Sequence, residues 1–330
     1  MEKYSQFRDK STGIAPFLPI STPLSPISIL MHGFLFFFRL PIFLGYALCY
    51  FIIFHYLPLP VVARKVALWG LMAVPGIWWV DLQLDGVRRG TLSEQPRERV
   101  PHAGSVMAAT FTSPIDAVYL AAVFDPIFTV SYPGDRRLRR VGLLGAVAAA
   151  LGPVRTVPPD DDDDAHLNDI NDLLAEYPNR VIAVFPECGT TNGKAILPLS
   201  PALAQCRPDV HIFPVSIRYD LPDVTTPVPG QWLAFFWNLL SRPTTCIRVR
   251  IAEGRRMDTT NGSNGSPMAS PATPQFPRRR IDPRSSVSNE EKRLLDRLGE
   301  SLARLSRVKR VGLTMTDKAA FVAALRGNKA

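Results

Sequence analysis

The stretch GSVMAATFTSPIDAVYL (residues 104–120) joins two different apolar patterns through a Thr-Ser-Pro turn. Residues 104–111 form an almost continuous apolar run, which is typical of a buried strand, and residues 114–124 show the apolar spacing of a helix. A strand that passes through a short turn into a helix is the repeating unit of an α/β sheet. The sequence therefore predicts an α/β fold with polar turn residues at the end of a buried strand.

Similar patterns recur along the chain. Strands are expected over residues 77–86, 126–132, 180–187, 210–219 and 246–254, the last as an edge strand, and helices over 136–152, 165–178 and 231–241. Strands that alternate with helices favour a mainly parallel sheet flanked by helices.

Composition divides the chain into four parts. We expect a polar N-terminus and membrane-embedded helices over residues 1–80, an α/β domain over 81–256, a disordered linker over 257–288 and an amphipathic C-terminal helix region over 289–330. The polar opening is not expected to act as a cleavable signal, because the apolar stretch begins too late.

Residues 26–59 are apolar almost throughout and are interrupted by Arg39 and Pro41. About 20 apolar residues cross a bilayer, so the segment is longer than one span and shorter than two. Basic residues lie on both sides of it, which gives no charge asymmetry to drive one end across. The expected arrangement is a bent hairpin that enters one leaflet and returns, with both ends in the cytosol. A single tilted transmembrane helix is the alternative.

Charge and cysteine content restrict the possible partners. The formal net charge of +9 favours anionic partners. A nucleic-acid partner is not expected, because the basic residues are spread over loops and a linker without interleaved aromatics. The four cysteines form no CxxC pair, so they read as reduced thiols facing the cytosol, and no metal site is expected. The acidic run at 160–164 is interpreted as a solvated segment.

Two short motifs carry candidate chemistry. Thr112-Ser113-Pro114-Ile115-Asp116 follows one predicted strand, and FPECGTTNGKAILPL (185–199) follows another. A third strand carries FPVSIRY (213–219). Ligands of α/β sheets gather beyond the carboxyl ends of the strands, so these motifs are expected to meet at one edge.

In this order the motifs resemble those of the glycerophospholipid acyltransferase family, of the lysophosphatidic acid acyltransferase type. Its first motif is His-x-x-x-x-Asp, which residues 111–116 match except at the first position. Its third is Phe-Pro-Glu-Gly-Thr, similar to residues 185–190, and its fourth is a Val/Ile-Pro-Val run, similar to residues 213–215. The resemblance covers roughly residues 1–255, and the extended TTNGKAILP is similar to fungal members.

The resemblance implies a membrane enzyme that transfers a fatty acyl chain from acyl-CoA to a lysophospholipid, most simply lysophosphatidic acid to phosphatidic acid. Acyl-CoA is a co-substrate, and no bound cofactor is implied. The implied location is the cytosolic face of the endoplasmic reticulum membrane or the surface of lipid droplets. The reaction needs a general base, oxyanion donors from a Gly-rich turn, a phosphate site and an apolar groove.

The resemblance also implies roles for individual residues. Asp116 occupies the position that orients the base, and Glu187, Gly189 and Thr190 help to hold the glycerol-phosphate. Lys194 is a candidate phosphate contact, and Arg155 stands for the arginine of the family's second motif. Each carboxylate also has a structural interpretation, because Asp116 could cap a helix and Glu187 could close a salt bridge. Lys194 could equally face solvent.

Two residues depart from the family pattern. Cys188 lengthens the glutamate motif by one residue, and Phe111 stands where the family has its basic histidine. Four routes stay open for the proton: a histidine from elsewhere, the phosphate of the acceptor, Asp116 itself, or no catalysis at all in a lipid-binding scaffold that assists membrane trafficking. The candidate histidines are His102, His166 and His211.

Overall fold

The structure is a computed structural model. It describes residues 2–22, 25–54, 57, 60–87, 95–158, 167–256 and 288–327. The acidic run 160–164, His166 and the expected linker up to residue 287 lie outside the described residues.

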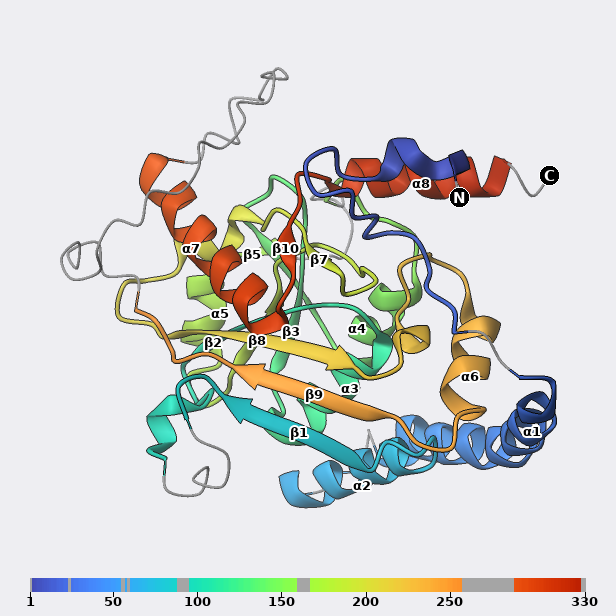
Figure 1. Cartoon of the computed structure of the whole chain (residues 1–330). Coiled ribbons are helices and arrows are strands. Elements are labelled where there is room, and N and C mark those ends of the chain that lie inside the picture. Colours follow the sequence, from blue (N-terminus) through green and yellow to red (C-terminus); the bar gives the residue numbers. More distant parts are fainter. Residues whose placement is uncertain are drawn as a thin grey trace.

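An eight-stranded mixed sheet forms the centre of the fold, in the order β1-β9-β8-β2-β6-β3-β4-β5 (Figure 1). The strands are β1 (Trp79–Leu84), β2 (Val106–Ala109), β3 (Ile127–Ser131), β4 (Leu138–Val141), β5 (Leu167–Asn168), β6 (Ile182–Phe185), β8 (Ile212–Tyr219) and β9 (Cys246–Ile251). The four central strands, β8, β2, β6 and β3, run parallel, and β1 is parallel to β9. The pairs β8–β9, β3–β4 and β4–β5 are antiparallel, so the α/β class is as expected but the sheet is mixed.

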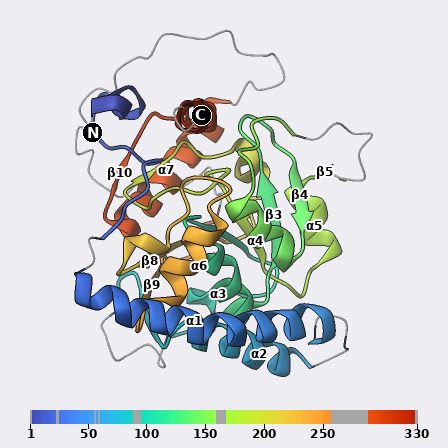
Figure 2. The same ribbon diagram turned by 90° about the vertical axis from the view of Figure 1, so that its right-hand side faces the viewer.

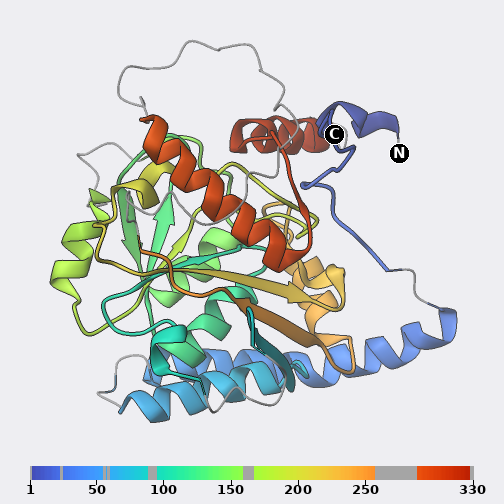
Figure 3. The same cartoon turned by 60° about the vertical axis from the view of Figure 1, so that its left-hand side comes forward.

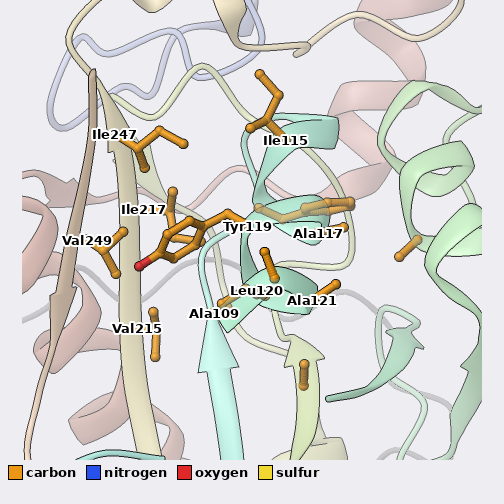
Figure 4. Packing of buried hydrophobic residues seen from close by; sticks show 14 of the residues in the cluster. Ala109, Ile115, Ala117, Tyr119, Leu120, Ala121, Val215, Ile217, Ile247 and Val249 are labelled. Carbon is orange, nitrogen blue, oxygen red and sulfur yellow. The ribbon is translucent and has the colours of Figure 1, made fainter. Parts of the chain in front are cut away.

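Helices cover both faces of this sheet. Met107 and Ala109 of β2 pack into one core with α2 (Val61–Ala73), α3 (Pro114–Phe124), α4 (Leu143–Leu151) and α6 (Trp232–Leu240). Val106 and Ala108 point the other way, into a second core with α5 (Ile170–Glu176) and α7 (Asn289–Ser306). Alternate residues of a strand face opposite sides, so β2 is buried on both faces. Figure 4 shows Tyr119 of α3 pointing towards Ile217 of β8 and Val249 of β9.

Three local predictions were wrong. Residues 136–152 do not form one helix, because β4 pairs with β3 as an antiparallel hairpin and α4 begins only at Leu143. The segment 165–178 begins with the short strand β5 before α5. The strand over 246–254 is not at the edge, since β9 lies between β8 and β1, and β1 takes the edge position.

The N-terminal apolar segment forms a helical pair below the sheet (Figure 2). The first helix, α1 (Pro26–Cys49), is not interrupted at Arg39 or Pro41 and continues into a π-helical turn. After it the chain returns alongside as α2. Residues Ser28–Ile52 are long and apolar enough to cross a membrane, and little of that segment is buried.

The N-terminal segment and the last helix lie side by side (Figure 3). Phe17 packs with Phe321 and Val322 of α8 (Met315–Gly327) in a third apolar core. This core also takes in Ala195 of β7 (Ala195–Ile196), which pairs with β10 (Lys309–Arg310). The pairing places α8 against the loop that follows β6.

Candidate functional site

The Thr-Ser-Pro turn is held by Asp116, the third residue of α3. Its Oδ2 accepts hydrogen bonds from the main-chain N–H of Thr112 (2.6 Å) and Ser113 (2.9 Å) and from the Thr112 hydroxyl (3.1 Å). Its Oδ1 accepts the hydroxyl proton of Tyr219 (2.5 Å). Ser113 and Asp116 form a reciprocal capping box, in which the Ser113 side chain accepts from the main-chain N–H of Asp116 and the Asp116 carboxylate accepts from the N–H of Ser113. Burial raises the pKa of Asp116 to about 6, and these hydrogen bonds oppose the rise.

The turn that follows β6 places Cys188 in the left-handed region, with φ of +62°. Its N–H closes the turn on the carbonyl of Phe185 (3.2 Å). Burial raises the pKa of the Cys188 thiol to about 12, so the thiol is protonated and unreactive. The extra residue is thus absorbed by a strained backbone position, which costs about 1–2 kcal/mol for a side chain with a Cβ.

Glu187 is buried next to this turn, where its carboxyl Oε2 accepts from the N–H of Leu197 (3.1 Å). Its Oε1 has no hydrogen-bond partner within the described parts of the chain. Burial raises the pKa of Glu187 to about 8, and the nearby Asp116 carboxylate raises it further. The glutamate is therefore mostly protonated at neutral pH, and the two acids lie close enough to interact.

Phe111 occupies the position where the family pattern has a histidine. Its ring stacks on that of Phe185, with 4.1 Å between centroids, and is almost fully buried. Its carbonyl accepts a hydrogen bond from the N–H of Thr191 (3.2 Å). The ends of β2 and β6 are joined through this residue, so the two motifs meet as the sequence predicts.

A narrow cavity of about 30 Å³ lies at the meeting point, with room for about one water-sized group. It brings together five of the residues singled out from the sequence, namely Phe111, Arg155, Cys188, Gly189 and Thr190. Three others are placed elsewhere. Asp116 and Glu187 are not among the lining residues, and Lys194 is exposed on the loop before β7.

Sequence reasoning missed Lys318, which reaches the same cavity from α8 and is 3% exposed. Its Nζ donates to the carbonyl oxygen of Thr190 (2.6 Å) and to the Thr190 hydroxyl (3.1 Å). The sequence does contain one signal for it, since Lys318 is spaced with the apolar residues Met315 and Val322 on one face of a helix. The structure shows that all three side chains are buried. A lysine inside an apolar stripe is unusual and indicates a specific environment.

No histidine of the described chain lines this cavity. His102 and His211 lie close to each other, 5.7 Å between ring centroids, at the amino ends of β2 and β8. The motifs are at the opposite, carboxyl ends of these strands. His32 is buried in α1. Among the described residues, no group of three or more His, Cys, Asp or Glu side chains could hold a metal ion.

A second cavity of about 270 Å³ is lined almost wholly by apolar side chains. It begins next to the first, because it is lined by Pro114 and Ile115, which follow Phe111 by three and four residues. Helix α4 separates the two, with Ala148 and Leu151 lining the apolar cavity and Ala149 and Gly152 lining the narrow one. The remaining walls come from α1, α2 and α6.

This arrangement is that of an α/β domain with two motif turns at the carboxyl ends of neighbouring parallel strands. Residues 92–218 match the model of the Acyltransferase family. The match extends from before β2 to Arg218 in β8 and does not include α8.

Two curated fungal proteins are similar to the chain. One is the "Putative lysophosphatidic acid:oleoyl-CoA acyltransferase" of Schizosaccharomyces pombe, 25% identical over 276 residues, which are 76% of this chain and 84% of the relative. The other is "Lysophosphatidic acid:oleoyl-CoA acyltransferase 1" of Saccharomyces cerevisiae, 23% identical over 205 residues, 61% of each chain. No solved structure matches the chain.

Proposed function

We propose that the protein transfers a fatty acyl chain from acyl-CoA to a lysophospholipid, most simply lysophosphatidic acid, to give phosphatidic acid. The match to the Acyltransferase family model and the names of the two fungal relatives support this choice of substrates. The proposed reaction is the attack of the acceptor hydroxyl on the thioester carbonyl, with release of CoA.

The observation that carries the proposal is the pairing of the two cavities across α4. The acyl chain needs an apolar site, and the second cavity offers one whose walls are aliphatic and aromatic. The reacting ester group and the phosphate need polar partners, which the narrow cavity offers. Since Phe111 and Pro114 line different cavities, the Thr-Ser-Pro turn lies where the acyl chain and the headgroup would meet.

In this proposal the glutamate turn stabilises the oxyanion. The N–H groups of Gly189 and Thr190 donate to no acceptor in the described chain, and both residues line the narrow cavity. Arg155 lines the same cavity from the segment after α4 and is exposed, so it takes the acceptor's phosphate. The headgroup enters by displacing Met315, a flexible side chain that contacts Gly189.

We also propose that the helical pair docks in one leaflet of a membrane. Exposed apolar side chains gather on α1, α2 and the start of β1, with further ones on α4 and α6. Arg39, in the middle of α1, donates to the carbonyls of Pro75 (3.3 Å), Arg242 (2.6 Å) and Pro243 (3.0 Å). A membrane-spanning α1 would pull these loops into the bilayer, so a helix lying in the interface is favoured.

Docking in a single leaflet suits the cytosolic face of the endoplasmic reticulum and also lipid droplets, which are covered by one monolayer. The apolar cavity is walled partly by α1 and α2, so its mouth would face the lipid. An acyl chain could then pass between cavity and membrane without crossing water.

The test uses purified full-length protein in detergent micelles with labelled oleoyl-CoA and lysophosphatidate. We expect labelled phosphatidate from the wild type and a loss of at least tenfold in Ala148→Trp, which fills the apolar cavity. Ala323→Trp is the matched control, because Ala323 is exposed on α8 and lines neither cavity. Binding of both substrates without product would instead favour a non-catalytic lipid-binding protein that assists membrane trafficking.

A further inference from the structure

The narrow cavity contains one side chain able to act as a base near neutral pH. The titratable groups among its lining residues are Arg155, Cys188 and Lys318. A guanidinium stays protonated in proteins. The Cys188 thiol stays protonated because burial raises its pKa to about 12. Phe111, at the position of the family's base, has no ionisable group, which leaves Lys318.

The hydrogen bonds of Lys318 fit a neutral amine. Both bonds go to Thr190, one to its carbonyl and one to its hydroxyl. The Thr190 hydroxyl donates its own proton to the carbonyl of Thr226 (2.6 Å), so it can only accept from the lysine. A neutral amine has two N–H groups and one lone pair. Both N–H groups are then used, and the lone pair is left without a partner in the described chain.

The charges around Lys318 act in both directions. Burial lowers its pKa to about 7, and Glu187 opposes this lowering only in its ionised form, which is the minor form at neutral pH. Arg155 faces the same cavity as a cation, and Cys188 is neutral there. No carboxylate of the described chain lies within 4 Å of the Lys318 amine as an ion-pair partner.

We propose that Lys318 is the general base of the acyl transfer and takes the place of the histidine that Phe111 replaces. The inference rests on the proposed function. The lone pair of Nζ removes the proton of the acceptor hydroxyl while its oxygen forms a bond to the thioester carbon. The tetrahedral intermediate then expels the CoA sulfur, which takes the proton from the Lys318 ammonium, so that ester and free thiol are formed.

The placement of α8 makes this substitution possible. Met315 and Lys318 lie one helical turn apart, and both reach the glutamate turn, where a Cβ on Gly189 would approach Met315 Cε to 2.1 Å. With no Cβ, Gly189 leaves room for the end of the Met315 side chain against the turn. The base comes from a helix outside the family match, across the cavity from the motif position.

The test measures steady-state acyl transfer by the full-length protein and four variants. Lys318→Met keeps the apolar stem and removes the base, and we expect kcat to fall by about 10²–10⁴-fold. Lys318→Arg supplies a permanent cation without a usable lone pair, and we expect an equal fall. The double variant Phe111→His/Lys318→Met restores a base at the family position, and we expect it to recover at least tenfold over Lys318→Met. Lys309→Met, an exposed lysine on β10, is the control.

The pH profile gives a second, independent measurement. We expect kcat/KM of the wild type to rise with pH through about 7, as the lysine loses its proton. Phe111→His/Lys318→Met is measured with the same acceptor, so that ionisation of the acceptor's phosphate is common to both profiles. A difference between the two midpoints is expected, and it does not depend on whether Lys318→Met alone folds well.

The outcomes separate this inference from the proposed function. An active wild type with equal activity in Lys318→Met overturns the lysine and leaves acyl transfer standing. Full activity in Lys318→Arg overturns it too, because the side chain would then act as a fixed cation. A wild type that forms no product ends both proposals together.

Discussion

Tyr219, the last residue of β8, donates its hydroxyl proton to Oδ1 of Asp116, the third residue of α3. The bond crosses from one parallel strand to the turn that follows its neighbour. Together with the three bonds to Oδ2, it means that both carboxylate oxygens of Asp116 already accept hydrogen bonds from the protein itself. We infer that this aspartate holds the shape of the Thr-Ser-Pro turn and does not itself take a substrate proton.

We expect Tyr219→Phe to lower the free energy of unfolding by about 1.5–3 kcal/mol, because a hydrogen bond to a charged group is lost in a buried site. Tyr132→Phe is the matched control. Its hydroxyl is buried without a partner within the described chain, so removing it should change stability little or raise it. Denaturant unfolding of both variants checks the prediction, and equal losses would contradict it.

The buried glutamate gives a pH dependence of stability with a definite sign. The pKa of Glu187 is about 8 in the folded protein and near 4.5 when exposed, so the folded state holds the proton more tightly. The contribution of the protonated Glu187 to the free energy of unfolding is therefore complete below pH 4.5 and is lost as the pH rises towards 8. We expect the free energy of unfolding to fall more steeply between pH 5 and 8 in the wild type than in Glu187→Gln. Parallel curves in a denaturant series would refute this.

The left-handed backbone at Cys188 predicts that glycine is more stable than alanine at this position, the reverse of the usual order. At φ of +62° glycine has no Cβ penalty, so we expect Cys188→Gly to be more stable than Cys188→Ala by about 1 kcal/mol. At Cys206, where φ is −61°, the order should reverse by about 0.5–1 kcal/mol. Thermal unfolding of the four variants measures both differences. The same order at both sites would show that the turn is not strained.

Variants of two neighbouring phenylalanines of α1 distinguish an effect on membrane docking from an effect on folding. Phe37 is 73% exposed, whereas Phe36 packs on Trp237 of α6, with 5.0 Å between ring centroids. We expect Phe37→Ser to weaken binding to phospholipid vesicles by roughly tenfold with an unchanged melting temperature, since one buried phenylalanine contributes about 1.5–3 kcal/mol. Phe36→Ser should lower the melting temperature. Vesicle flotation that is insensitive to Phe37→Ser would argue against docking through α1.

Much of the fold was predictable because its core strands are short apolar runs followed by turns. The strand and helix around the Thr-Ser-Pro turn appear as β2 and α3, and the run before FPE appears as β6. The hairpin partner β4 was missed, because its arginines and the apolar residues of α4 together imitate one amphipathic helix. Only the pairing of β4 with β3 decides between a strand and a helix for these residues, and the local sequence pattern does not reveal that pairing.

The candidate site was predictable to the extent that it follows strand ends. The motif turns could be placed, since carboxyl ends of parallel strands meet at one edge. Lys318 could not, because it comes from a helix about 130 residues after the glutamate turn, and its burial depends on the third core. The strained conformation of Cys188 was equally hidden, since an inserted residue does not reveal which backbone angle absorbs it.

The contact of α8 with the glutamate turn also changes which sequence features would identify active relatives of this protein. A survey that demands the imidazole at the first motif position would discard this chain as inactive. A survey that also asks whether a lysine lies on the apolar face of the C-terminal helix would retain it. Under the proposal for Lys318, this criterion separates proteins that have lost the base from proteins in which another element supplies it.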